Sequence, residues 1–385
     1  MTRLWWALIL VIALAGCAQQ AVVPQLRPQA LLHDESFTKP AQPIDAHEVF
    51  ALDDAMRSYL REGPGRYSHR PYRARALIDA LYKRGDLKLE YDSSTTRNAQ
   101  QAFAARAGNC LSLVVMTAAL AKELDLQIEY SSAYTDEVWS RSGALLMRSG
   151  HINITLNKRL IEQERGEDRR SWTVDFLPQG ELRGLRTKSL QEKTVVAMFM
   201  NNRAAEALAR DANDEAYWWA REGLLADPEF GGVVNTLGVI YQRTGHAGAA
   251  EQVFAELLRR QPDQTQALNN MALLLEQQGR PAEASAYRTR LAALEPEPPY
   301  HWFALGQQAL RRGDARAARD LFAREVARAD YSSEFHFWLA IAHYQLGETR
   351  DAQHHLERAE ALSTSRDERA IYAAKLAWLN QHRTP

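Results

Sequence analysis

Cysteine is nearly absent from this chain of 385 residues, which holds only Cys17 and Cys110. The two lie in unrelated sequence contexts, so we expect no framework of disulfides. An excess of one charge sign is also lacking, because 47 basic and 48 acidic residues give a formal net charge of −1. A chain with balanced charge has no general electrostatic attraction for nucleic acid or for an anionic membrane, so no nucleic-acid partner is expected.

Long apolar runs are absent beyond the N-terminal segment, which excludes membrane-spanning helices from the rest of the chain. Closely spaced histidines and cysteines of the metal-binding kind are lacking as well. His336 and His343 stand seven residues apart, and His354-His355 follow without close ligand spacing. We interpret these histidines as structural or surface residues and expect neither a metal nor a cofactor. The chain is long enough for two or three domains.

The first 17 residues have the features of an export signal. Arg3 supplies positive charge, and the apolar run from Leu4 to Leu14 is too short to span a membrane comfortably. The ending Leu14-Ala15-Gly16-Cys17 resembles the lipobox of bacterial lipoproteins, in which the signal is cut before a cysteine that carries the lipid. The resemblance implies lipidation of Cys17. An ordinary secretory signal or an N-terminal anchor helix is the alternative, and neither needs this cysteine.

Ala18 follows the predicted lipidation site. In the usual bacterial sorting pattern a residue other than Asp at this place implies the outer membrane. We therefore expect a protein of the cell envelope that is anchored to the membrane through Cys17 and faces the periplasm. Residues 18–44, with several prolines among Gln and Ala, are predicted to form an extended tether without a core of its own.

The second cysteine begins the most apolar helical pattern of the chain. Gly108-Asn109 ends the preceding helix-like run. Apolar residues then recur three and four positions apart, at Leu113, Val114, Met116, Ala119, Leu120 and Leu124. A thiol in the first turn of a helix lies near unpaired N–H groups and the positive end of the helix dipole, which favour the thiolate. Cys110 is therefore a candidate nucleophile, and a small buried residue at a helix start is the alternative.

Downstream, the apolar pattern changes to the alternation of β-strands. Residues 151–156 alternate polar and apolar side chains, beginning with His151, and residues 172–176 do so again with Asp175 among the polar ones. A cysteine-protease-like site needs a thiolate, an imidazole that takes and returns its proton, and an acceptor that orients the imidazole. Adjacent antiparallel strands can hold His151 and Asp175 side by side, and a helix packed on that sheet brings Cys110 to them.

Three short motifs resemble the signature of the transglutaminase-like superfamily. They are Gly108-Asn109-Cys110 before an apolar helix, Gly150-His151 at the start of an alternating strand, and Trp172-Thr173-Val174-Asp175. The resemblance implies a papain-like α+β domain over residues 45–195, with Cys110 as nucleophile, His151 as general base and acid, and Asp175 as the residue that orients the histidine. The family usually has an aromatic residue two places after the histidine and a proline after the aspartate, where this chain has Asn153 and Phe176. The resemblance therefore leaves the substrate class open.

The C-terminal half repeats itself every 34 residues. Two sets of small residues keep this interval: Gly245, Gly279, Gly313 and Gly347, and Ala250, Ala284, Ala318 and Ala352. Leu237-Gly238, Tyr241, Phe254 and Pro262 resemble the tetratricopeptide repeat (TPR), in which each unit is a pair of helices. We expect an all-α solenoid over residues 196–366, with a degenerate unit from about 197 and regular units from 231, 265, 299 and 333. Residues 367–385 are predicted to be a capping helix and tail.

The first helices of the repeats are expected to line a concave groove. Seven residues are predicted on that side: Asn235, Arg243, Asn269, Tyr300, Phe303, Arg311 and Phe337. Amide and cationic groups beside aromatic rings suit an extended peptide or a protein tail, which is the predicted partner. A solvated face without a ligand is the alternative, since every solenoid presents such a surface.

Together these patterns predict a lipid-anchored envelope protein in which a transglutaminase-like α+β domain precedes a TPR solenoid. The predicted reaction is attack by the Cys110 thiolate on an amide carbonyl, followed by hydrolysis of the acyl-thioester. Abundant water favours cleavage of peptide or isopeptide bonds over cross-linking. Two alternatives stay open, namely acyl transfer to an amine and a non-enzymatic scaffold that binds partners through both domains.

Overall fold

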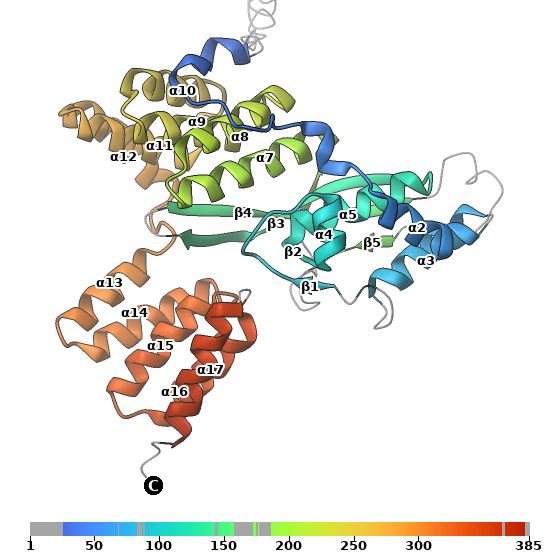
Figure 1. Cartoon of the computed structure of the whole chain (residues 1–385). Coiled ribbons are helices and arrows are strands. Elements are labelled where there is room, and N and C mark those ends of the chain that lie inside the picture. Colours follow the sequence, from blue (N-terminus) through green and yellow to red (C-terminus); the bar gives the residue numbers. More distant parts are fainter. Residues whose placement is uncertain are drawn as a thin grey trace, which may run out of the picture.

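A computed structural model describes residues 26–67, 69–82, 87, 89–142, 145–157, 172–174, 176, 186–363 and 366–381. An α+β region in the first half of the chain is followed by a helical solenoid, and the segment that precedes the α+β region runs back over the solenoid (Figure 1). None of the helices in these ranges is both long and apolar enough to cross a membrane.

The α+β region is built from short helices around a small sheet. Its helical elements are the 3₁₀-helix η3 (Ala46–Phe50), α2 (Asp54–Glu62), the 3₁₀-helix η4 (Pro64–Arg66), α3 (Arg70–Tyr82), α4 (Ala99–Ala105) and α5 (Cys110–Glu123). Helix α5 is the central one, because every side chain from Leu111 to Ala121 is buried. The helix that the apolar spacing predicts after Cys110 is thus confirmed.

Four strands form an antiparallel sheet in the order β5-β4-β3-β6. They are β3 (Gln127–Ser142), β4 (Leu145–Asn157), β5 (Trp172–Val174) and β6 (Arg186–Leu190). Tyr130 of β3 pairs with Ile154 of β4, and Ile154 pairs with Val174 of β5, so these three side chains share one face of the sheet. All three are buried in one hydrophobic core with α5. The alternation predicted for β4 and β5 therefore places an apolar face against the central helix.

The solenoid consists of helix pairs. Its helices are α7 (Glu192–Ala209), α8 (Asn213–Ala226), α9 (Gly231–Arg243), α10 (Ala247–Arg260), α11 (Thr265–Gln277), α12 (Pro281–Leu294), α13 (His301–Arg311), α14 (Ala315–Arg328), α15 (Ser333–Gln345), α16 (Thr349–Leu362) and α17 (Arg366–Gln381). Each of the four regular units makes its turn at a glycine with positive φ, at Gly245, Gly279, Gly313 and Gly347. Asp211, 34 residues before Gly245, has a φ of 59° and makes the corresponding turn of the degenerate unit. The predicted TPR array and its final helix are confirmed.

The first solenoid helix also belongs to the α+β core. Val195, Phe199 and Met200 of α7 are buried with the residues of α5 and the sheet, whereas Ala204 and Leu208 of the same helix are buried in the solenoid. One helix therefore contributes to both cores and joins the two parts directly.

The solenoid core divides between α12 and α13. Within the continuously described stretch 186–363, one buried cluster ends at Ala284 and the next begins at Tyr300. Pro296, Pro298 and Pro299 lie between these helices, where proline cannot continue a helix. Leu294 at the end of α12 is 41% exposed. Helices α13–α17 accordingly form a second lobe that stands apart from α7–α12 (Figure 1).

Residues 26–38, which we call the strap, lie across α8, α9 and α10 (Figure 1). The strap contains the 3₁₀-helices η1 (Pro28–Leu31) and η2 (Asp34–Ser36). Leu26, Leu31 and Phe37 are only 8, 3 and 6% exposed, because they enter the solenoid core. The prediction of an extended tether without a core over residues 18–44 is therefore wrong for this part. Polar residues form most of its composition, but three apolar side chains dock it together with bonds to Tyr217, Arg221 and Tyr241.

Candidate functional site

Cys110 is the first residue of α5 and is half-buried. Asn109 caps the helix, since its Oδ1 atom accepts hydrogen bonds from the backbone N–H of Ser112 at 2.9 Å and from the Ser112 hydroxyl at 2.8 Å. Its Nδ2 atom donates to Thr96 Oγ1 at 2.9 Å. The residue before the thiol is thus fixed from two sides, and the thiol lies at the helix N-terminus that the sequence predicts.

Tyr91 is the residue that the sequence analysis missed. Strand β1 (Glu90–Tyr91) pairs in parallel with β2 (Ala107–Gly108), and this pairing brings Tyr91 to the start of α5. The phenol lies close enough to Cys110 to interact with it electrostatically. Burial, together with the nearby Cys110, raises the pKa of Tyr91 above its ordinary value, so the phenol stays protonated at neutral pH. A neutral O–H donor therefore lies beside the thiol.

The loop between β1 and α4 is held against the same helix end. Arg97 donates its backbone N–H to Ser112 Oγ at 2.8 Å, and its Nη2 atom lies 2.9 Å from Asp92 Oδ2. Burial alone would raise the pKa of Asp92, but hydrogen bonds from Ser94 and the interaction with Arg97 outweigh burial and lower it. Asp92 is therefore a carboxylate at neutral pH, and its ion pair stabilises the loop beside Cys110.

Within the described part of the α+β region, buried polar atoms without a hydrogen-bond partner include one in the loop before α4 and one in β4. They are Nη1 of Arg97 and Oδ1 of Asn153, which stands in β4 two residues after His151. A buried group in this state is stabilised when a water or a ligand completes its hydrogen bond. The region around β4 and the loop before α4 thus offers polar positions for a bound molecule.

The other two predicted catalytic residues lie partly outside the described part of the chain. The backbone of His151 pairs with Ala133 within the β3–β4 hairpin, but its side chain is not described. Asp175 lies outside the described residues and directly follows β5. Helix α5 packs on β4, and β4 pairs with β5. The elements that carry Cys110 and His151 are thus in contact, and the strand that precedes Asp175 is the neighbour of the His151 strand.

The first helices of successive repeats are joined by polar contacts at an offset of 35 residues. Thr236 donates to Asn201 at 2.7 Å, and Asn270 donates to Asn235 at 3.0 Å. Arg243 of the predicted groove donates to the backbone carbonyl of Leu208 at 2.9 Å. Asn235 and Arg243 therefore link neighbouring repeats and are already engaged within the solenoid.

The remaining groove residues differ in accessibility. Asn269 accepts a hydrogen bond from Arg288 at 2.8 Å, and Phe337 lies under the ring of Tyr372 of α17 at a centroid distance of 5.1 Å. Arg311 is exposed. Five of the seven predicted groove residues are thus exposed or partly covered rather than buried: Asn235, Arg243, Asn269, Arg311 and Phe337.

Tyr300 and Phe303 do not line an open groove. Tyr300 is 8% exposed and Phe303 is 1% exposed. Phe303 stands three residues before Gly306, on the face of α13 that packs against Phe322 of α14, and its ring also lies 5.2 Å from that of Phe335. The prediction that these two rings contact a partner is wrong, because Phe303 faces the core of the second lobe from α13, and Tyr300, the N-cap of this helix, packs against Phe335.

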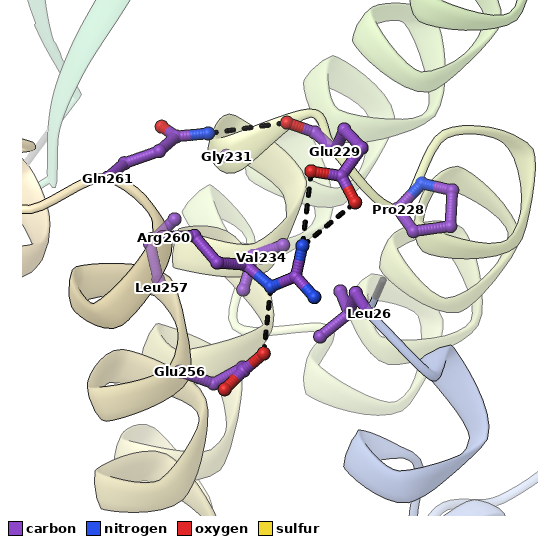
Figure 2. A pocket seen from close by; sticks show the side chains of 9 residues that line it. All are labelled: Leu26, Pro228, Glu229, Gly231, Val234, Glu256, Leu257, Arg260 and Gln261. Carbon is purple, nitrogen blue, oxygen red and sulfur yellow. Dashed lines mark hydrogen bonds and ion pairs between the residues drawn. The ribbon is translucent and has the colours of Figure 1, made fainter. Parts of the chain in front are cut away.

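A small cavity lies where the strap begins (Figure 2). Leu26 covers it, and Arg260 closes it through bonds to Glu256 at 2.8 Å and to Glu229 at 2.9 Å. Its volume of about 10 Å³ is close to the minimum for one water molecule. This cavity is a point of contact between the strap and the solenoid and is too small to bind a substrate.

Comparison with protein-family models supports a repeat architecture in the helical, C-terminal half of the chain. The tetratricopeptide repeat family model matches residues 299–324 and 333–358, and the C-terminal part of the chain is a TPR array. Among solved structures, PilF of Pseudomonas aeruginosa is 19% identical, with 50% of this chain and 96% of that chain covered and a TM-score of 0.28. A thermophilic TPR protein of Thermus thermophilus is 16% identical, with 47 and 99% covered and a TM-score of 0.30.

The TPR protein YrrB, described as having an unusual peptide-binding site, is 17% identical, with 47% of this chain and 92% of that chain covered and a TM-score of 0.25. No curated protein matches the sequence. The matched structures cover about half of this chain.

Proposed function

We propose that this chain is a lipoprotein of the bacterial cell envelope, anchored through Cys17 and facing the periplasm. Its TPR solenoid binds a protein partner, and its α+β region hydrolyses peptide or isopeptide bonds through Cys110, His151 and Asp175. TPR arrays are protein-interaction scaffolds, so the binding role follows from the repeats themselves. The envelope location and the hydrolase activity go further and rest on the sequence motifs and on the surroundings of Cys110.

The observation that carries the enzymatic proposal is the position of Cys110. A half-buried thiol begins the most buried helix of the region, and that helix packs on the strand that contains His151. A helix N-terminus stabilises negative charge on sulfur, and partial exposure leaves the atom accessible to a substrate. This placement combines the two conditions that a nucleophilic cysteine requires.

The proposed reaction proceeds in two steps, acylation of Cys110 and hydrolysis of the resulting thioester. His151 takes the Cys110 proton, the sulfur attacks the amide carbonyl carbon, and the collapse of the tetrahedral intermediate breaks the C–N bond as His151 protonates the leaving amine. Water then attacks the thioester with His151 as base, which releases the carboxylic acid and restores the thiol. We assign the neutral Tyr91 hydroxyl, which interacts with Cys110, as the hydrogen-bond donor to the oxyanion.

The test uses the full chain with Cys17 replaced by Ser, so that Cys110 is the single thiol. We expect an electrophilic cysteine-hydrolase probe to label this purified protein, and we expect the protein to cleave peptide amides. Cys110→Ala is expected to abolish both signals and to keep the circular-dichroism spectrum. Equal hydrolysis by the Cys110→Ala protein would end the enzymatic proposal.

Two further readouts separate the alternatives. Product that forms only when an amine is added would indicate acyl transfer rather than hydrolysis. Absence of turnover, combined with capture of the same envelope protein by wild type and by Cys110→Ala, would indicate a scaffold. Arg311→Glu tests the solenoid in the same capture experiment, because Arg311 is an exposed cation among the predicted groove residues.

A further inference from the structure

Helices α15 and α16 form a hairpin that contains four of the eleven histidines of the chain. These are His336 and His343 on α15, and His354 and His355 on α16. Their spacing along the sequence gives no ligand motif. The antiparallel hairpin nevertheless brings three of them into one row, because the rings of His336 and His343 both stack on that of His355, with centroid distances of 5.2 and 5.4 Å.

The row ends at two carboxylates near the turn of the hairpin. His343 Nδ1 lies 2.6 Å from Glu348 Oε2. One donor atom from each of His343, Glu348 and Asp351 lies within 4.8 Å of the other two. Donor atoms bound to one zinc ion at about 2.0–2.2 Å are at most about 4.4 Å apart, so small side-chain movements would close this set around an ion.

Surrounding residues fix the orientation of this group. Glu348 offers only Oε2 to His343, because its Oε1 atom accepts a hydrogen bond from Arg319 of α14 at 2.9 Å. Outer contacts of this kind orient the ligands of metal sites. Arg319 holds the carboxylate in place from a neighbouring helix and leaves the second oxygen directed at the histidine.

His336, at the far end of the row, has a defined tautomer. His336 Nε2 lies 3.1 Å from the backbone carbonyl of Asp330, and a carbonyl can only accept, so Nε2 carries the proton. His336 Nδ1 is then the acceptor of the 2.9 Å contact with His355 Nδ1, which donates. The two imidazoles are thus neutral partners that leave His343 free to use its Nδ1 atom toward the carboxylates.

We propose that His343, Glu348 and Asp351 bind a divalent transition-metal ion, with Zn²⁺ the best chemical match. An imidazole nitrogen with carboxylate oxygens suits Zn²⁺, whereas Mg²⁺ and Ca²⁺ prefer ligand sets made of oxygen alone. Three protein ligands leave a fourth position for water or for a side chain of a bound protein. The ion joins the end of α15 to the start of α16 and so stabilises the second lobe.

The experiment uses the full chain without a histidine tag, freed of metal with a chelator and titrated with ZnCl₂ by calorimetry. We expect Zn²⁺ to bind at one site formed by His343, Glu348 and Asp351 and to raise the melting temperature. MgCl₂ is expected neither to bind there nor to change the melting temperature. Asp351→Asn is the main variant because Asp351 is exposed and its replacement leaves the fold intact. It is expected to weaken Zn²⁺ binding at least about tenfold, and His343→Ala by more.

His354→Ala is the matched control, since His354 is an exposed histidine on the same helix. We expect it to bind Zn²⁺ as the wild type does. The proposal is overturned if the wild type binds no Zn²⁺, or if Asp351→Asn and His343→Ala bind it with unchanged affinity, which would place the ion elsewhere. An equal loss in His354→Ala would also overturn it, because binding would then depend on surface histidines in general.

Discussion

Arg221 of α8 and Asp34 of the strap form an ion pair across 187 residues, with Nε of the arginine 3.0 Å from both carboxylate oxygens. The hydroxyl of Tyr217 donates to the same carboxylate at 2.7 Å, and it accepts the backbone N–H of His33 at 3.0 Å. These partly buried bonds join the start of the described chain to the solenoid. The segment next to the predicted lipid anchor is therefore part of the repeat structure.

Removal of the Phe37 ring is expected to release the strap. This ring stacks on Tyr217 at a centroid distance of 3.9 Å. Phe37→Ala should weaken docking of the strap by roughly 3 kcal/mol, the lower end of the cost of a buried Phe-to-Ala change. Limited proteolysis with mass spectrometry should then detect faster cleavage within residues 26–44. Lys39→Ala is the control, because Lys39 is exposed, and an equal cleavage rate in the two variants would contradict the prediction.

Gly238 and Gly248 provide a matched pair of sites for glycine-to-alanine substitution within one repeat. A Cβ atom on Gly238 would lie 2.4 Å from the ring of Phe254, whereas one on Gly248 has no neighbour within 4 Å. Gly238→Ala is expected to lower the free energy of unfolding by about 1–3 kcal/mol through overpacking. Gly248→Ala in the first turn of α10 should be neutral or stabilising by up to about 1 kcal/mol. Urea unfolding measures both, and equal effects would mean that the Phe254 ring moves aside freely.

The cap beside Cys110 should contribute to stability. Asn109→Ala removes the acceptor for Ser112 and is expected to lower the free energy of unfolding by about 1 kcal/mol. Asn109→Asp keeps that acceptor and loses only the donor to Thr96, so a smaller effect is expected. Chemical denaturation of the two variants gives the comparison. If both lose the same amount, the bond to Thr96, and not the cap, is the stabilising interaction.

The ion pair of Asp92 with Arg97 predicts a pH dependence of stability. The pKa of Asp92 is lowered from its ordinary value of 3.8, so its contribution is complete above that value and is lost as the pH falls through the folded-state pKa. Asp92→Asn should therefore lower the urea midpoint at neutral pH. The difference from wild type should be constant between pH 7 and about 5, and it should shrink as the pH falls below about 4 toward the folded-state pKa. A difference that does not shrink below about pH 4 would exclude the carboxylate charge as its source.

Local sequence patterns were sufficient to predict the TPR repeat and the central helix α5. Each TPR unit needs a small residue where two helices approach and a glycine at a turn of positive φ, so its signal recurs at fixed positions such as Gly238 and Gly245. The burial of α5 follows from its own apolar residues. Both features depend on neighbours that are close in sequence, and such features are predictable from it.

Contacts between distant segments could not be predicted in this way. The parallel pairing that brings Tyr91 to Cys110, the docking of Phe37 on Tyr217 and the row of histidines all require the tertiary fold. Phe303 was misassigned because helix periodicity alone does not say which apolar face points inward. Of the predicted catalytic residues, the position of Cys110 at a helix start was foreseen, and the meeting of the three side chains stays a prediction.

The docked strap also sets a geometric limit on where the protein can act. From Cys17 to Leu26 there are nine residue steps (26 − 17), which span at most about 30 Å when fully extended. A lipid on Cys17 would thus keep Leu26, and with it the end of α10 that Leu26 contacts, within that distance of the bilayer surface. Partners would have to come to a thin layer next to the membrane, because the protein could not search the depth of the surrounding compartment for them.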